Sequence, residues 1–181
     1  MTRLFEVKKD NLNTSHWVSL LHHEISVAGA PNQERLHTWI DDHGITDLVT
    51  LQRTDEVSPW VSELAHSHNI TWHHFPISGK HMRSPSVLPS LFSLLEWTSH
   101  LTKESTSRKI VIHCSAGLHR TGVALYLVGR GTGSSHENTL NLVKEVRSMT
   151  ASELTRTPKK GLSLAEQALS IFEQWQLSES V

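Results

Sequence analysis

Cysteine is almost absent from this sequence, because Cys114 is the only one in 181 residues. A single thiol cannot form an intramolecular disulfide, which excludes the small secreted scaffolds that depend on such bridges. No second thiol is present to protect Cys114 by reversible bond formation. We therefore expect its oxidation to give a sulfenic acid or a mixed disulfide with another molecule.

Long apolar runs and an excess of charge of one sign are also lacking. Residues 1–10 contain no apolar segment of signal-peptide length, and no later run has the length and apolarity to span a bilayer. The formal net charge is -1, whereas a general nucleic-acid binder presents a basic face. These absences predict a cytoplasmic protein that binds neither nucleic acid nor membrane, and we expect it to be a monomer.

Histidine, in contrast, is frequent, with 14 residues. Pairs such as His22-His23 and His73-His74 raise the question of a metal site. No HExxH pattern and no second cysteine accompany them, and adjacent residues of a strand point to opposite faces. We therefore expect no metal and no other cofactor.

The length suits one domain, which we place at residues 1–181 with a core from about 22 to 176. Strand patterns alternate with segments whose apolar residues recur at helical spacing. Strands are expected at 24–29, 46–51, 70–75 and 110–112, and helices at 31–44, 57–64, 86–101, 123–128, 134–149 and 162–175. Residues 1–20 are less regular, with a short strand near 4–7 and a loop carrying Trp17. The alternation predicts an α/β fold with a central, mostly parallel sheet flanked by helices on both faces.

The most informative stretch is residues 110–122, Ile-Val-Ile-His-Cys-Ser-Ala-Gly-Leu-His-Arg-Thr-Gly. An apolar β-branched strand runs into a turn centred on Gly117 and then into a helix. A loop between Cys114 and Arg120 can aim its backbone N–H groups at one point. Those donors, the positive end of the helix and the guanidinium fork of Arg120 would together hold a phosphate-sized dianion.

Positive surroundings of this kind favour the thiolate form of a cysteine, which is the nucleophile in covalent catalysis. Cys114 is therefore the candidate nucleophile, at the carboxyl end of a strand, where sites of α/β proteins lie. Thr121 can donate a hydrogen bond to the sulfur, and His113 would order the loop from behind. The candidate phosphate-binding residues are Ser115, Ala116, Gly117, Leu118, His119 and Arg120.

The pattern His-Cys-x-x-Gly-x-x-Arg-Thr-Gly resembles the Cys-x5-Arg signature loop of the cysteine-dependent protein tyrosine and dual-specificity phosphatases. The likeness covers about residues 22–176, and the segments 43–49 and 73–77 are similar to strands of kinase-associated phosphatases. It implies hydrolysis of phosphate monoesters in proteins, at phosphotyrosine or phosphoserine/threonine, through a phosphocysteine intermediate. The implied catalytic residues are Cys114, Arg120 and Thr121, with Gln167 near the hydrolytic water.

The sequence departs from the family pattern where the family places an aspartate that protonates the leaving oxygen. The corresponding loop, residues 78–85, has no carboxylate, although general acid catalysis commonly contributes about 10²–10⁴-fold. Three explanations stay open. Another group donates the proton, with His81, His119 and Asp55 as candidates; the substrate has a leaving group that needs no acid, such as a phosphoanhydride; or the protein is a catalytically weak module that binds phosphorylated partners.

The second explanation has a resemblance of its own. Gly-x-His-Arg-Thr-Gly, together with the loop before the signature strand, is similar to atypical plant and fungal phosphatases that act on inositol pyrophosphates. Lys80, His81 and Arg83 would then ring the pocket with positive charge for a polyanionic substrate. The expected partner is therefore a phosphorylated protein or a small phosphorylated molecule.

Overall fold

The computed structural model describes residues 7–12, 15–79, 82 and 84–180. The strands are β1 (Val7–Leu12), β2 (Ser15–Leu20), β3 (His23–Ala28), β4 (Asp47–Thr50), β5 (Thr71–His74) and β6 (Lys109–His113). The helices are α1 (Gln33–Asp41), α2 (Trp60–Ser67), α3 (Leu88–Leu101), α4 (His119–Gly131), α5 (His136–Val146), α6 (Ser148–Thr155) and α7 (Leu164–Glu179). The α/β prediction is confirmed.

All the strands belong to one sheet, in the order β1-β2-β3-β6-β4-β5. β3, β6, β4 and β5 run parallel, while β2 pairs antiparallel with β3 and β1 pairs antiparallel with β2 at the edge of the sheet. The predicted, mostly parallel arrangement is therefore confirmed. Since the parallel strands end at the same edge of the sheet, the loops that follow β6, β4 and β5 lie next to one another there.

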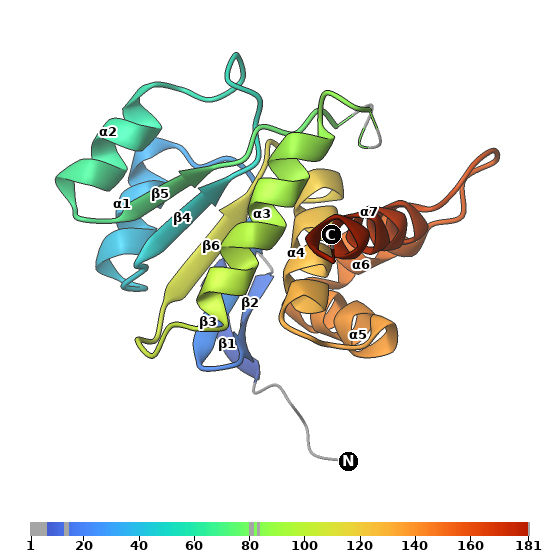
Figure 1. Ribbon diagram of the computed structural model, residues 1–181. Helices are drawn as coiled ribbons and strands as arrows, with labels where there is room; N and C mark the ends of the chain where they lie inside the picture. The colour runs from blue at the N-terminus through green and yellow to red at the C-terminus, as the bar shows by residue number, and fades with distance from the viewer. Residues whose placement is uncertain (1–6, 13–14, 80–81, 83, 181) are drawn as a thin grey trace.

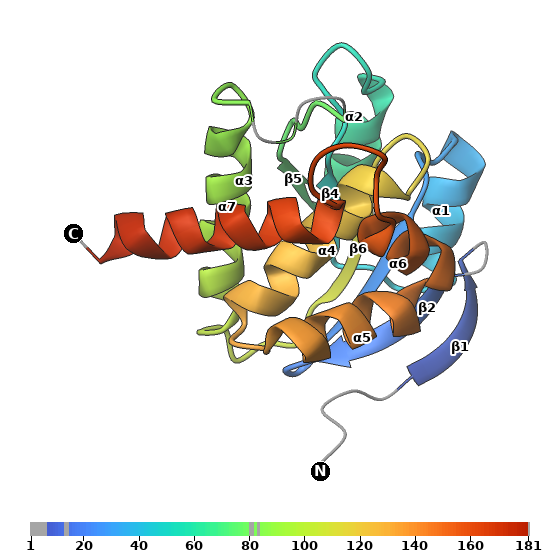
Figure 2. The ribbon, with the colours of Figure 1, turned by 90° about the vertical axis from the view of Figure 1, so that its right-hand side faces the viewer.

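Helices cover both faces of the sheet. α1 and α2 lie on one face, and α3 to α7 lie on the other (Figures 1 and 2). The central strand β6 is buried on both faces: Val111 packs in the core below α1 and α2, whereas Ile110 and Ile112 pack in the core beneath the other helices. This burial explains why its apolar run is continuous and does not alternate with polar residues.

The antiparallel end of the sheet was not predicted. Trp17, expected in a loop, lies in β2 with 1% of its surface exposed, and Val18 and Leu20 beside it are also buried. The buried core thus begins before residue 22. Of the strand expected near 4–7, only Val7 belongs to the described part of the chain, where it begins β1 (Val7–Leu12). Residues 15–20 lack a clear strand pattern in the sequence. They form a strand because they pair with β3.

The helix expected at 134–149 is in fact two helices. α5 ends at Val146 and α6 begins at Ser148, because Arg147 between them has the extended dihedrals φ -161 and ψ 110. A residue in that conformation cannot continue an α-helix. α6 then occupies part of the segment that was expected to be an irregular connection.

Two further properties concern the described residues only. None of their helices combines the length and the apolarity that a membrane crossing demands. Among the same residues, no three histidine, cysteine, aspartate or glutamate side chains are grouped so that they could ligate a metal ion.

The burial of Trp17 predicts a large stability cost for its removal. We expect Trp17→Ala to lower the free energy of unfolding by about 3–5 kcal/mol, as for other large-to-small core substitutions. Leu177→Ala is the control, because Leu177 is 71% exposed and should cost less than about 0.5 kcal/mol. Urea unfolding measures both. Equal, small effects would mean that Trp17 does not belong to the core.

Candidate active site

The connection from β6 to α4 is a tight turn of the backbone, and we call residues 114–120 the cysteine loop. Gly117 at its centre has φ +69, and a Cβ atom there would lie 2.5 Å from the carbonyl carbon and oxygen of Ala28. Only glycine permits so close an approach of the loop to the end of β3. The cysteine loop is thereby fixed against the carboxyl edge of the sheet, where the strand-turn-helix pattern predicted it.

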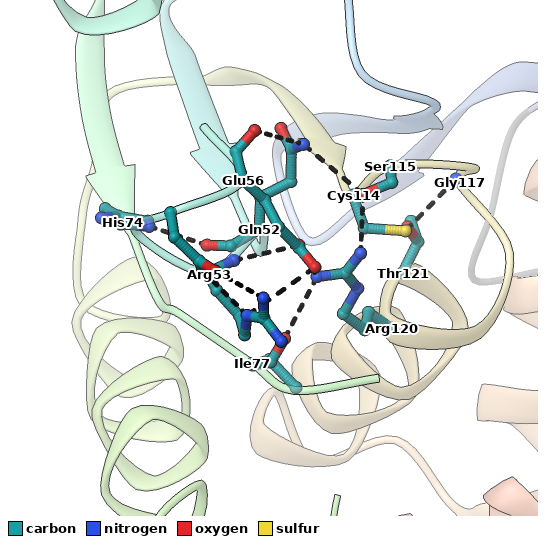
Figure 3. Close-up of polar contacts among 11 residues, drawn as sticks. Gln52, Arg53, Glu56, His74, Ile77, Cys114, Ser115, Gly117, Arg120 and Thr121 are labelled. Atoms are coloured by element: carbon teal, nitrogen blue, oxygen red, sulfur yellow. Dashed lines mark hydrogen bonds and ion pairs between the residues drawn. The ribbon is translucent and has the colours of Figure 1, made fainter. Parts of the chain in front are cut away.

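The sulfur of Cys114 is buried and receives two hydrogen bonds. The Gly117 N–H donates to Sγ at 3.2 Å, and the Thr121 hydroxyl donates at 3.0 Å (Figure 3). Both donors stabilise negative charge on the sulfur. The predicted contact between Thr121 and Cys114 is therefore present, and it comes from the first turn of α4.

Arg120 carries the buried positive charge of the cysteine loop, with 8% of its surface exposed. Its Nη1 donates to the Glu56 carboxylate at 2.5 Å and to the Ile77 carbonyl at 3.2 Å, and its Nη2 donates to Ser115 Oγ at 2.7 Å (Figure 3). These partners fix the plane of the guanidinium group. A Cβ added at Gly79 would lie 3.7 Å from Arg120 Nε, so Gly79 lies beside the remaining edge of the guanidinium.

Glu56 is a site residue that the sequence analysis missed. It lies in the loop after β4, which includes residues 57–59, because α2 begins only at Trp60 and not at the predicted Val57. Burial alone would raise the pKa of Glu56, but the hydrogen bonds from Arg120 and from the Arg53 backbone bring the pKa below its ordinary value. Glu56 is therefore a carboxylate at neutral pH, and it holds Arg120 from the sheet side.

Gln52, from the same loop, connects Glu56 with the cysteine loop. Its Nε2 donates to the Glu56 carbonyl at 3.2 Å and, at 3.4 Å, to Ser115 Oγ (Figure 3). The backbone of Ser115 is held as well, because its carbonyl accepts a hydrogen bond from the Ala30 N–H at 3.1 Å. In a trans peptide the next N–H points the opposite way. The Ala116 N–H is thus turned away from Ala30.

His113 lies directly before Cys114 and is completely buried. Its Nε2 is 2.7 Å from Thr50 Oγ1, and the Trp72 indole N–H donates to the same hydroxyl at 2.9 Å. Burial lowers the pKa of His113 to about 3, so the ring is neutral under ordinary conditions. The predicted position of His113 behind the loop agrees with these contacts.

His119 and Gln167 lie in different helices but share one cavity of about 240 Å³. The cavity is lined by Gly79, His119, Glu153, Arg156, Pro158, Leu162, Ser163, Leu164 and Gln167. His119 is half exposed and its Nε2 is 2.9 Å from the Glu153 carboxylate. Gln167 Nε2 donates to the Leu162 carbonyl at 2.9 Å. The structure thus places the predicted water-positioning residue and one predicted proton donor beside Gly79.

The other two candidate proton donors are not part of this arrangement. Asp55 is exposed, and hydrogen bonds from Arg53 at 2.5 and 2.9 Å lower the pKa of the Asp55 carboxyl group. Asp55 is therefore ionised at neutral pH and has no proton to give. His81 lies outside the described residues, together with Lys80 and Arg83, which were expected to surround the pocket.

Residues 34–156 match the family described as protein-tyrosine phosphatase. No curated protein matches the chain. The match covers β4 to β6, the cysteine loop and α4 to α6, so it includes the residues that form the hydrogen bonds described above with Cys114 Sγ and with the Arg120 side chain.

Solved structures share the fold. Tk-PTP in its active form has a TM-score of 0.61 and 17% identity over 92% of this chain and 98% of that chain. Kinase associated phosphatase, with its catalytic-site cysteine substituted by serine, has a TM-score of 0.61 and 18% identity. The likeness covers 84% of this chain and 86% of that chain. The core catalytic domain of the PP-IP phosphatase SIW14 from S. cerevisiae, in complex with citrate, has a TM-score of 0.59 and 18% identity. The likeness covers 90% of both chains. At these identities the likeness establishes the architecture.

The neutral, buried His113 predicts a specific loss of stability in acid. Its pKa is about 3 in the folded protein, below the ordinary value of 6.5. The unfolded chain therefore binds a proton below about pH 6.5 that the folded chain does not bind until about pH 3, which costs about 1.4 kcal/mol of stability per pH unit in between.

Urea unfolding of the wild type and of His113→Gln at several values between pH 4 and 7 checks this expectation. The slope of unfolding free energy against pH should be steeper for the wild type by about 1.4 kcal/mol per pH unit. All other titrating groups are common to the two proteins. Parallel slopes would contradict a neutral His113 in the folded state.

Proposed function

The chain belongs to the protein-tyrosine phosphatase family, and we propose that it hydrolyses phosphate monoesters in proteins, at phosphotyrosine or phosphoserine/threonine, through a phosphocysteine intermediate. One observation carries the proposal. Cys114 Sγ accepts hydrogen bonds from the Gly117 N–H and the Thr121 hydroxyl, and Arg120 of the same loop is held in a fixed orientation. A thiol nucleophile beside a rigid anion-binding fork is what phosphoryl transfer to sulfur needs.

The proposed reaction has two steps at the same sulfur. In the first, Cys114 Sγ attacks phosphorus in line, an S–P bond forms and the P–O bond to the leaving group breaks. Arg120 and the backbone N–H groups of the cysteine loop stabilise the charge on the equatorial oxygens. In the second, water attacks phosphorus and the S–P bond breaks, returning the thiolate, whose charge the Thr121 hydroxyl stabilises. Gln167 is the proposed residue that positions this water.

We propose His119 as the proton donor to the leaving oxygen, because the usual loop aspartate is absent. His119 lines the same cavity as Gly79, the residue at which the family pattern places the acid. The Glu153 carboxylate lies 2.9 Å from Nε2 and orients the imidazole ring. Asp55 is supported less well, since its ion pair with Arg53 holds it in the ionised form.

Two alternatives from the sequence keep specific support. Hydrolysis of inositol pyrophosphates would need no general acid, and the SIW14 structure, described as that of a PP-IP phosphatase, shares the fold. A phosphate-binding module with weak turnover would also tolerate a loop without an acid. Both alternatives use Arg120 and the cysteine loop in the same way. The first differs from the main proposal in the bond that is broken, and the second differs in that little or no bond cleavage follows binding.

The setting that we propose is the cytoplasm, with the chain acting as a monomeric single domain without cofactor. The lone thiol and the net charge of -1 support a reducing compartment and a local phosphate site. One sheet takes in strands from Val7 to His113, and α7 packs on α3, α4 and α6, which supports a single folding unit.

Replacement of the nucleophile tests the proposed reaction directly. Cys114→Ser should reduce hydrolysis of para-nitrophenyl phosphate by about 10⁴-fold or more, because the serine hydroxyl is not ionised there. Binding of inorganic phosphate, followed by calorimetry, should persist because Arg120 and the loop are unchanged. Acid quenching of the wild type during turnover should trap phosphate on Cys114, detected by mass spectrometry. Turnover in wild type without such an intermediate would contradict the mechanism, and phosphate binding without turnover would favour the binding module.

The role of His119 is tested by comparing leaving groups. His119→Asn should lower kcat/KM for phenyl phosphate by about 10²-fold, since phenolate needs a proton, and should affect para-nitrophenyl phosphate much less. Gly79→Asp should restore part of the loss, because position 79 has ordinary van der Waals space and no positive φ. Equal effects on the two substrates would exclude His119 as the donor. A wild type that cleaves only phosphoanhydrides would favour the inositol pyrophosphate alternative.

A further inference from the structure

We propose that Arg147 and Thr150 are positioning residues that hold the Gly117 carbonyl outward, so that the Leu118 N–H faces the bound phosphoryl group. The inference rests on the proposed function in one respect, which is that the anion bound by the cysteine loop is a phosphoryl group. Neither residue belongs to the cysteine loop. Both come from the start of α6: Arg147 lies within the single helix that was expected over 134–149, and Thr150 lies directly after it.

The Gly117 carbonyl accepts two hydrogen bonds at once. Arg147 Nη1 donates to it at 3.0 Å, and Thr150 Oγ1 donates at 3.0 Å. Thr150 is completely buried, and Arg147 is half-buried, so these are interior contacts. Two donors, one of them charged, fill both lone pairs of the carbonyl oxygen and make its direction hard to change.

The direction of this carbonyl decides what the loop offers to an anion. In a trans peptide the Gly117 C=O and the Leu118 N–H point in opposite directions. While Arg147 and Thr150 hold the oxygen, the Leu118 N–H is turned to the other side, where the Gly117 N–H meets the sulfur. Rotation of this peptide would exchange a donor for an acceptor at the anion site.

The break between α5 and α6 supplies the geometry. Arg147 is extended, and its own N–H still donates to the Val143 carbonyl, so it ends α5 and starts α6 at one residue. Residues three apart lie on the same face at a helix start. Arg147 and Thr150 thus reach the same oxygen together, which explains why a sequence with helical periodicity is interrupted there.

Gly122 allows α6 to come close enough for these contacts. A Cβ atom at Gly122 would lie 3.1 Å from the Thr150 methyl group and 3.6 Å from the Thr150 carbonyl oxygen. The first of these distances is tighter than ordinary packing permits. The last glycine of the signature pattern therefore has a packing role, because it leaves room for the helix that carries Thr150.

The test measures binding of inorganic phosphate by calorimetry in the Cys114→Ser protein, which separates binding from chemistry. Adding Arg147→Met or Thr150→Val should each weaken binding by about tenfold, because a misaligned Leu118 N–H weakens one hydrogen bond to a charged group. Because the two donors share one acceptor, the double variant should lose more than the product of the single losses.

Conservative variants distinguish the positioning of the Gly117 carbonyl from effects of charge and of packing. Thr150→Ser keeps the hydroxyl and Arg147→Lys keeps the charge and one donor, so both should bind phosphate within about threefold of the Cys114→Ser parent. Lys144→Met is the matched control for charge, because Lys144 is exposed on α5. It should leave the affinity unchanged, and urea unfolding of each variant verifies that it folds.

The outcomes distinguish the two proposals. If neither the wild type nor the Cys114→Ser parent binds phosphate, the proposed function fails. If the parent binds phosphate and the folded Arg147→Met and Thr150→Val variants bind it equally well, the positioning role is overturned while the proposed function stands. If either variant does not fold, Arg147→Ala or Thr150→Ala takes its place in the Cys114→Ser protein. Weaker phosphate binding than in the Arg147→Lys and Thr150→Ser variants supports the positioning role, and equal binding overturns it.

Discussion

A bend of the main chain can hold a dianion only if its carbonyl oxygens are engaged elsewhere, since an oxygen facing the anion would repel it. In the cysteine loop the Ser115 carbonyl is occupied by the Ala30 N–H, and the Gly117 carbonyl by Arg147 and Thr150. One partner thus follows β3 in the chain, and the other two come from the start of α6. Much of the surrounding fold can be understood as a set of partners for those oxygens.

The two sides of the loop are supported by different kinds of contact. On the sheet side, a carboxylate and a main-chain carbonyl hold the guanidinium of Arg120, and a buried hydroxyl meets His113. On the helical side, donors hold the main chain itself. The guanidinium group of Arg120 and the carbonyl of Gly117 are therefore fixed by separate elements, which lie far apart in the sequence.

The sequence predicted the structure correctly where the contacts that determine it are local. The strand, turn and helix of residues 110–122 lie where the pattern predicted, because their apolar spacing and Gly117 decide them within one short stretch. Glu56 was missed because it meets Arg120 64 residues later in the chain, and its neighbours Arg53 and Asp55 give the same charged signal. The break at Arg147 was missed because its partner, the Gly117 carbonyl, lies 30 residues away.

The bare backbone at Gly79 has a consequence for the shape of the entrance. Gly79 itself presents no side chain to the guanidinium edge, so this residue adds no bulk at that wall of the cavity. The facing wall, with Pro158, Leu162 and Leu164, presents carbon surface instead. The connection that leads into α7 therefore supplies much of the lining of this cavity, although it lies more than 30 residues beyond the cysteine loop in the sequence.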